Sequence, residues 1–174
     1  MLYQTNTAAK TKQIVGISDM KLSKNPQDQI ITYSLGSCLG VVLYDKAIKS
    51  ASLLHLMLPD SAIERVSKDS SFFNAYKFVD TAIPKMIEEF QKLGATKQTT
   101  KLAVFGGARV FKSKDHFNIG KRNYVAFRKT IWKFGLLIAK EHVGGDVHRT
   151  VSIDVETGII TLDVNKQETV TYQL

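Results

Sequence analysis

Short apolar segments separated by polar turns run through most of the chain and predict a protein rich in β-strands. Residues 14–23 alternate apolar and polar positions, which is typical of a strand, and the polar turn after them leads to a second strand near Ile30. In the segment 101–111, a strand is predicted to run into a paired-glycine turn at Gly106 and Gly107. The other predicted strands are 38–45, 50–59, 136–143, 148–155 and 159–164. The last two are joined through Glu-Thr-Gly, which favours a hairpin-like connection.

Two segments have the three- and four-residue apolar spacing of amphipathic helices. Residues 78–95 form the first of these segments, and Gly94 supplies its stop signal. Pro84 leaves two alternatives, because a proline inside a helix removes a backbone hydrogen bond: the helix kinks there, or it starts anew with Pro84 in its first turn. The second helix is predicted to begin after Asn118 as N-cap, to cover 119–134 and to end at the following glycine.

Six or more strands with two helices that do not alternate regularly favour an α+β architecture with layered sheets over a doubly wound parallel sheet. The 174 residues, 44% of them hydrophobic, fit a single domain over 1–174, in which the polar residues 1–12 are expected to be mobile. No segment approaches the roughly 20 apolar residues of a membrane span, and the start of the chain has no apolar signal segment. The single cysteine suits a reducing compartment. We therefore expect a cytoplasmic protein without membrane insertion.

Positive charge is concentrated in residues 101–140. This segment has ten basic residues and one acidic residue, a net charge of +9, whereas the whole chain carries +8. Such a segment is typical of a surface for nucleic acid, anionic membrane or an acidic protein, and also of a solvated face without a partner. The chain has no nucleic-acid motif and no glycine-rich nucleotide loop, so nucleic acid is not the expected partner.

The only cysteine, Cys38, follows a Gly-Ser turn and lies at the start of a predicted strand. His55 lies within an apolar stretch on the next strand, where a titratable ring is costly unless it has partners. A cysteine nucleophile needs a base, and the base needs a group that holds its ring, for which Thr32 is a candidate. The backbone around Gly36 and Ser37 is a candidate oxyanion site, because a residue without Cβ lets a substrate approach the chain.

The residues alone leave other interpretations open. Free cysteines are often buried, and a histidine on an apolar strand is more often a core residue than a catalytic one. A metal site is not expected, because the chain has no metal-binding motif and His142 and His148 are interpreted as strand and turn residues. No cofactor is predicted.

Five segments resemble one known family in order and spacing. They are TYSLGSCLGVVLYD, LLHLMLPDS, KLAVFGGARVF, NIGKRN and GGDVHRTVSIDVETG, and the resemblance runs from about Ile14 to Val164. The chain resembles the CheD family of chemoreceptor glutamine deamidases. This resemblance implies a β-sandwich with outer helices similar to bacterial toxin-type cysteine deamidases, and a triad of Cys38 as nucleophile, His55 as base and Thr32 as the residue that orients the base.

The resemblance also implies partners. Receptor cytoplasmic helices would be the substrate, and a CheC-type phosphatase would bind in competition with them. Because such receptor helices tend to be acidic, Lys121, Arg128 and Lys129 are predicted to contribute to docking. The chain departs from the family pattern at His148, where the family usually has glycine before the arginine, which puts the geometry of that loop in question.

Two rival functions stay open. One is a regulatory binding partner of a CheC-type phosphatase with secondary or no deamidase activity. The other is a different cysteine amidohydrolase, such as a protease or a transglutaminase-like enzyme.

Overall fold

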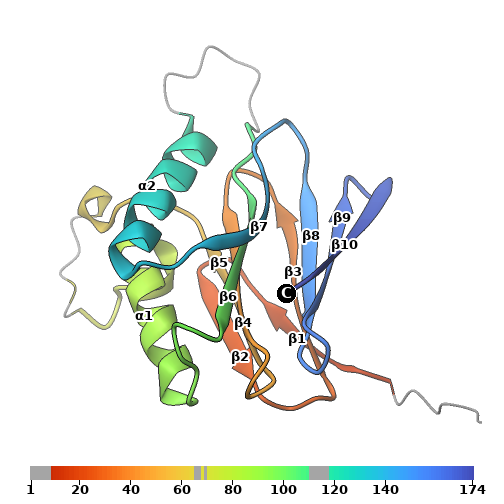
Figure 1. Cartoon of the computed structure of the whole chain (residues 1–174). Coiled ribbons are helices and arrows are strands. Elements are labelled where there is room, and N and C mark those ends of the chain that lie inside the picture. The colour runs from red at the N-terminus through yellow and green to blue at the C-terminus, as the bar shows by residue number, and fades with distance from the viewer. Residues whose placement is uncertain (1–8, 65–67, 69, 110–117) are drawn as a thin grey trace, which may run out of the picture.

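Two five-stranded sheets pack face to face in the computed structural model, which describes residues 9–64, 68, 70–109 and 118–174 (Figure 1). In order across the sheet, sheet A consists of β1 (Thr11–Val15), β3 (Asp28–Leu35), β8 (Arg149–Asp154), β9 (Ile159–Val164) and β10 (Glu168–Gln173). In the same way, sheet B consists of β2 (Asp19–Ser23), β5 (Ser50–Leu56), β4 (Leu39–Asp45), β6 (Thr100–Gly106) and β7 (Ile138–Val143).

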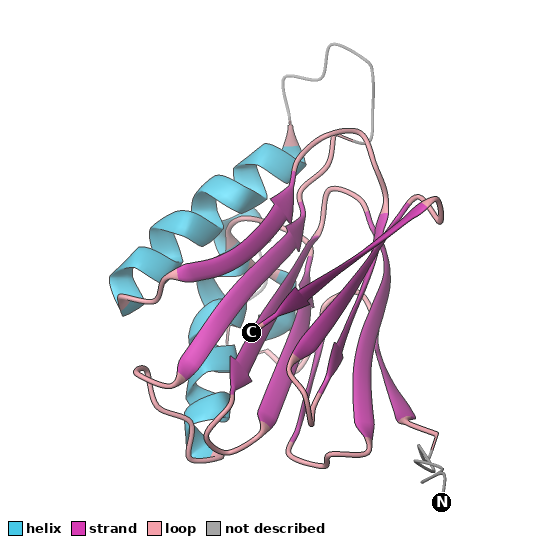
Figure 2. Ribbon diagram, turned by 45° about the vertical axis from the view of Figure 1, so that its right-hand side comes forward, coloured by secondary structure: helices cyan, strands magenta, loops and turns pink. Residues whose placement is uncertain are grey.

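Helices α1 (Val79–Lys92) and α2 (Ile119–Phe134) cover the face of sheet B that points away from sheet A (Figure 2). The short 3₁₀-helices η1 (Ser61–Ile63) and η2 (Ala75–Lys77) precede α1. The expected α+β architecture with layered sheets and outer helices is therefore confirmed.

Sheet B lies between two hydrophobic cores. One core fills the space between the sheets and includes Ile30 of sheet A and Leu53 of sheet B. The other lies between sheet B and the helices and includes Leu54, Phe90 and Phe127. Since both faces of sheet B are covered, every residue of β4 and β5 is buried. This double burial explains why their sequences are continuously apolar rather than alternating.

The two helices agree with the sequence pattern in their buried faces and their ends. Asn118 caps α2 by accepting a hydrogen bond from the backbone N–H of Lys121 at 3.0 Å, and Gly135 ends the helix in the left-handed conformation. Helix α1 begins at Val79 and continues through Pro84. The alternative in which a new helix starts with Pro84 in its first turn is therefore wrong.

The N-terminal strand prediction is wrong in one respect, because residues 14–23 form two strands in different sheets. β1 pairs in parallel with β3 in sheet A, and β2 pairs with β5 in sheet B. The chain crosses between them at residues 16–18, where Ser18 has a φ of 58°. Thr11 and Lys12, which were expected to be mobile, form the start of β1, and residues 1–8 lie outside the described part.

One other difference concerns the edge of sheet A. β10 was not predicted, because its sequence is polar and most of its residues are exposed at the edge of sheet A. β6 ends at Gly106, which agrees with the predicted paired-glycine turn, and positions 110–111 of that segment lie outside the described residues together with 112–117 of the basic segment. No helix within the described ranges has the length and apolar content that a membrane crossing requires.

Candidate active site

Cys38 lies where the chain passes from one sheet to the other. It follows β3 of sheet A and precedes β4 of sheet B by one position. A β-bulge between Thr32 and Leu35 bends the end of β3, and Ser34 within it has a φ of 56°. Bulges re-aim the chain at such places. The bulge and the crossing place Cys38 at a corner of the sandwich, where its side chain is partly buried.

The strand register places Cys38 and His55 on the same face of sheet B. Gly40 of β4 is the direct partner of His55 of β5, and Cys38 comes two residues before Gly40. Residues two apart on a strand share a face, so both side chains point toward sheet A. Cys38 packs against the core between the sheets, in agreement with this direction. Two strands that are adjacent in sequence and in space thus bring the predicted nucleophile and base to one corner.

Thr32 reaches the same space from sheet A. Its Oγ1 lies 2.8 Å from His55 Nδ1 and donates a hydrogen bond to the backbone carbonyl of Val15 at 2.9 Å. A hydroxyl has one proton, and a carbonyl oxygen can only accept, so Thr32 Oγ1 accepts the bond from His55. Nδ1 of His55 therefore carries the proton of the neutral ring, and Nε2 is left as the acceptor.

Nε2 of His55 is buried and has no hydrogen-bond partner among the described residues. No hydrogen bond joins it to Cys38 Sγ in the described part of the chain. The pair is thus held on one face without a hydrogen bond between the two reactive atoms in the described structure. Such loose geometry is common in active sites that tighten only when a substrate binds.

Burial keeps both groups neutral. It lowers the pKa of His55 to about 4, because the charged imidazolium loses water. It also raises the pKa of the Cys38 thiol, an effect that the backbone N–H of Cys38 partly opposes. The resting site therefore contains a thiol and a neutral imidazole rather than a thiolate–imidazolium pair. An imidazole with a free Nε2 can act as a general base when the thiol loses its proton.

The peptide groups before and after Cys38 are fixed by hydrogen bonds through their carbonyl oxygens. The carbonyl of Gly36 accepts from the N–H of Ala108, and that of Cys38 accepts from the N–H of Gly107, both at 2.8 Å. The carbonyl of Ser37 accepts from Asn123 Nδ2 at 3.0 Å. In a trans peptide the N–H points opposite to the carbonyl, so the N–H groups of Ser37 and Cys38 point away from these donors. Within the described chain, neither N–H donates a hydrogen bond to another residue, so both are candidate donors to a substrate oxygen.

Asn123 is a site residue that the sequence analysis missed. Its side chain is fully buried, and Nδ2 donates to two carbonyls, that of Ser37 beside the cysteine and that of Met57 beyond His55, at 3.0 and 2.9 Å. One amide group from α2 therefore links the two segments that carry the predicted nucleophile and base. A signal was present, because Asn123 lies four residues before Phe127 on the buried face of the helix. A polar residue at such a position needs partners.

Gly106 lies close against the backbone of Cys38. Its φ is 106°, and a Cβ at this position would lie 2.2 Å from the carbonyl oxygen of Cys38. The paired glycines of the predicted turn therefore have a steric reason, since only glycine combines this conformation with so close an approach.

Arg149 and His142 hold the loop between β7 and β8. Arg149 is buried and donates to Nδ1 of His142 and to the carbonyl of Gly144, both at 2.7 Å. Gly144 in turn donates to the carbonyl of Gly106 at 2.9 Å, which connects this loop to the turn behind Cys38. His142 thus has a structural role. In the part of the chain that the structure describes, no group of three or more histidine, cysteine or acidic side chains could hold a metal ion.

His148 does not distort this loop. Its N–H and its carbonyl both bond to Asn165, at 2.8 and 2.9 Å. His148 does not have a positive φ, so the backbone at this position does not require glycine.

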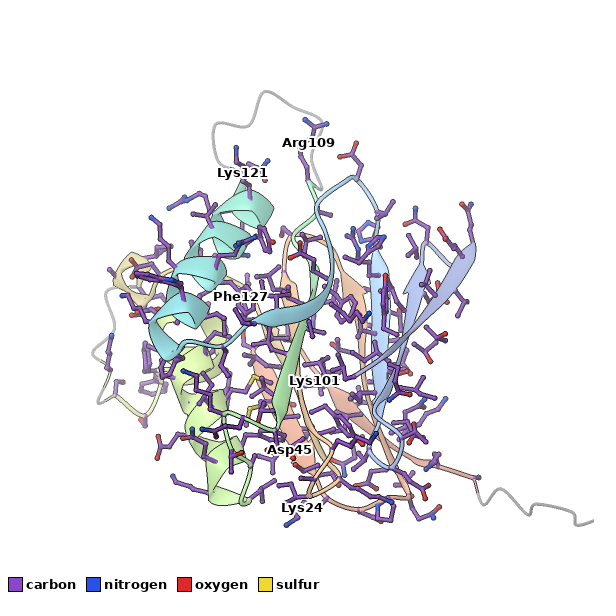
Figure 3. The ribbon with its side chains drawn as sticks, viewed as in Figure 1. Lys24, Asp45, Lys101, Arg109, Lys121 and Phe127 are labelled. Carbon is purple, nitrogen blue, oxygen red and sulfur yellow. The ribbon has the colours of Figure 1, made fainter. Side chains whose placement is uncertain are left out.

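The predicted docking residues Lys121, Arg128 and Lys129 all lie exposed on α2, outside the Cys38 corner. Lys121 is at the end of the helix close to Arg109, as Figure 3 shows. It lines a cleft with Gly107, whereas Arg128 lies further along the helix beside β7. The structure therefore spreads the three residues along the helix rather than bringing them together.

The fold and the corner together define a layered α+β protein with a candidate cysteine–histidine hydrolase site. Comparison with known proteins identifies its family. The family described as CheD, chemotactic sensory transduction, matches residues 57–164. The chain is 39% identical over 155 residues to a probable chemoreceptor glutamine deamidase CheD of Solibacter usitatus, covering 89% of this chain and 90% of that protein.

Two other relatives have similar names. A probable chemoreceptor glutamine deamidase CheD of Desulforamulus reducens is 42% identical over 154 residues, with 85% of this chain and 87% of that protein covered. The protein named CheD 1 in Syntrophus aciditrophicus is 39% identical over 145 residues, with 83% and 89% covered. The chain belongs to the CheD family.

Proposed function

We propose that this protein is a chemoreceptor glutamine deamidase, which converts receptor glutamine side chains to glutamate and releases ammonia. The observation that carries the proposal is the buried hydrogen bond between Thr32 and His55 beside the partly exposed Cys38, in a chain of the CheD family. The names of the relatives, which describe chemoreceptor glutamine deamidases, support the same activity.

In the first half of the reaction, the sulfur of Cys38 attacks the side-chain amide carbon of the glutamine. His55 Nε2 accepts the thiol proton as the carbon–sulfur bond forms, because Thr32 holds the proton of the neutral ring on Nδ1. The negative charge that develops on the amide oxygen is stabilised by the N–H groups of Ser37 and Cys38. His55 then gives its proton to the departing nitrogen, the carbon–nitrogen bond breaks, and a thioester and ammonia result.

In the second half, water attacks the thioester carbon. His55 accepts a proton from the water and returns it to the sulfur of Cys38 as the carbon–sulfur bond breaks. The product is glutamate, and the enzyme regains its thiol. Gly36 precedes the nucleophile and, without a Cβ, leaves room for the substrate side chain near the backbone.

The remaining predictions belong to the same proposal. Lys121, Arg128 and Lys129 attract an acidic receptor segment to α2 without taking part in the chemistry. A CheC-type phosphatase is the proposed regulatory partner, and the protein acts in the cytoplasm. The likeness to toxin-type cysteine deamidases is likewise proposed, on the basis of the layered α+β fold and the corner cysteine.

The test is to incubate the protein with a receptor cytoplasmic fragment in heavy-oxygen water and to analyse the fragment by mass spectrometry. Deamidation through a thioester places one heavy oxygen in each new glutamate side chain, and the Cys38→Ala variant should leave the fragment unchanged. A protease would cut the backbone instead, and a transglutaminase-like enzyme would attach amines. Intact glutamines after prolonged incubation with the wild-type protein would contradict the proposal.

A further inference from the structure

The outward face of α2 has an exposed stripe that no part of the described chain covers. Lys121, Val125, Arg128 and Trp132 follow at spacings of four, three and four residues, which places them on one side of the helix. Val125 is 43% exposed and Trp132 is 82% exposed. The same spacing forms the seam by which one helix packs against another in a coiled coil.

Strand β7 extends this surface on one side of α2, as Figure 1 shows. β7 is the edge of sheet B and pairs with β6 alone in the described chain, and Leu137 just before it is 87% exposed. A hollow of about 570 Å³ lies between the helix and the strand. We call it the α2–β7 groove; its lining includes Arg128, Ile131, Trp132, Leu137, Lys140 and Glu141.

The charge of the groove is positive. Arg128 and Lys140 line it, and Lys129 and Lys133 lie on the neighbouring stripe of α2. Its one acidic lining residue, Glu141, accepts a hydrogen bond from the hydroxyl of Tyr124 at 2.5 Å. A second copy of the chain would bring like charges together in this groove, whereas an acidic partner would neutralise them.

We propose that the α2–β7 groove docks an acidic amphipathic helix of the chemoreceptor substrate, with apolar side chains of that helix against Trp132 and Leu137. The inference rests on the proposed function, because it takes the occupant to be part of the receptor. The groove is concave and runs beside a helical seam, which suits another helix better than the flat surface of a membrane.

The position of the groove fits a substrate that also reaches Cys38. Asn123 on α2 contacts the carbonyl of Ser37, next to the nucleophile. From Asn123 to Trp132 the helix rises by roughly 14 Å. A receptor helix that lies along α2 therefore spans the distance from the level of Ser37 to the groove in two to three helical turns. The groove contributes to substrate affinity and takes no part in the chemical steps.

Trp132 is the only tryptophan in the chain, so its fluorescence reports directly on the groove. The first experiment adds a tryptophan-free receptor cytoplasmic fragment to the Cys38→Ala variant, in which turnover is blocked. We expect a saturable blue shift of the emission, because docking removes the indole from water. An unchanged spectrum at saturating fragment would overturn the proposal. The proposal would also be overturned if phosphatidylglycerol vesicles or a single-stranded oligonucleotide shifted the emission and the receptor fragment did not.

The second experiment measures deamidation of the same fragment by groove variants. Trp132→Ala and Leu137→Ala should each raise KM about tenfold, as truncations of central interface residues do, and leave kcat within about twofold. Phe72→Ala is the matched control, since Phe72 is an equally exposed aromatic residue outside the groove lining. An unchanged KM in both groove variants would refute the docking role.

Charge reversal tests the acidic character of the occupant. Arg128→Glu combined with Lys133→Glu should raise KM and flatten its dependence on salt, whereas Lys24→Glu should do neither, because Lys24 lies outside the groove lining and at the end of the molecule opposite Lys121 (Figure 3). A KM at low salt that equals the wild-type value would contradict an acidic occupant. If wild-type protein does not deamidate the fragment at all, the proposed function fails, and the fluorescence titration still decides whether the groove binds it.

Discussion

Replacement of Asn123 should disturb the geometry of the active site, and therefore kcat, while leaving the binding of substrate nearly unchanged. Asn123→Ala removes the amide group that donates to the carbonyls of Ser37 and Met57, at 3.0 and 2.9 Å. Each lost hydrogen bond at a buried acceptor costs about 1 kcal/mol or more, and the cavity left by the amide adds to this. We expect the free energy of unfolding to fall by about 2–4 kcal/mol.

The larger effect of Asn123→Ala should be on kcat. The segments with Cys38 and His55 would no longer be held at a fixed separation, and a displacement of about 1 Å near reacting groups can cost 100-fold in rate. We expect kcat on a receptor fragment to fall about 10- to 100-fold and KM to change by less than about threefold. Asn123→Asp should lower kcat at least as much, because an aspartate oxygen in place of Nδ2 cannot donate a hydrogen bond to either carbonyl.

The assay combines steady-state deamidation with urea unfolding, so that rates refer to folded enzyme. Thr130→Ala is the matched control on the same helix, because the Thr130 hydroxyl donates to the carbonyl of Ala126 within α2 and, in the described chain, forms no hydrogen bond with either segment. If Asn123→Ala were less stable but had the kcat of the wild type, Asn123 would support the fold and would not position the site. That outcome would refute the positioning role of Asn123.

Three other predictions concern Thr32, the pH dependence and Gly106. Thr32→Val should lower kcat at least about tenfold, whereas Thr32→Ser, which keeps the hydroxyl, should lie within about threefold of wild type; equal rates for both would remove Thr32 from the site. Because burial lowers the pKa of His55 from about 6.5 to about 4, the unfolded chain binds a proton first as pH falls, so urea unfolding between pH 6.5 and 4 should show a loss of about 3 kcal/mol that His55→Gln lacks. A pH-independent difference between the two proteins would contradict the burial of a neutral ring. Gly106→Ala should lower both stability and kcat, because its Cβ would displace the carbonyl of Cys38; unchanged kinetics and unfolding would contradict the close approach.

The fold class and most elements could be predicted from the sequence because local signals and tertiary structure agree in them. The apolar faces of both helices, the cap at Asn118 and the end at Gly135 follow from side-chain spacing and backbone preference. The course of residues 14–23 could not be predicted in this way. Alternation of apolar residues continues across residues 16–18, although the chain changes sheets there: Val15 of β1 packs into the core between the sheets, whereas Met20 of β2 packs into the core between sheet B and the helices.

The candidate site was predictable where residue chemistry is unusual and unpredictable where it depends on long-range packing. A lone cysteine after a turn and a histidine in an apolar strand are visible in the sequence, and their adjacency follows from consecutive antiparallel strands. Their catalytic roles stay predictions. Asn123 is 86 residues from Ser37, and no local pattern indicates that α2 would reach that carbonyl. The tautomer of His55 likewise depends on the carbonyl of Val15, which only the fold brings near Thr32.

The central claim is that Cys38 forms a thioester with a receptor glutamine, and acid quenching tests it most directly. Wild-type protein is mixed with receptor fragment, quenched with acid during turnover, digested and analysed by mass spectrometry. We predict a peptide containing Cys38 that carries the substrate peptide with the loss of ammonia, and neither the adduct nor deamidation in Cys38→Ala, which should fold normally. His55→Ala should be nearly as inactive. Deamidation that continues in Cys38→Ala at most of the wild-type rate would contradict the account.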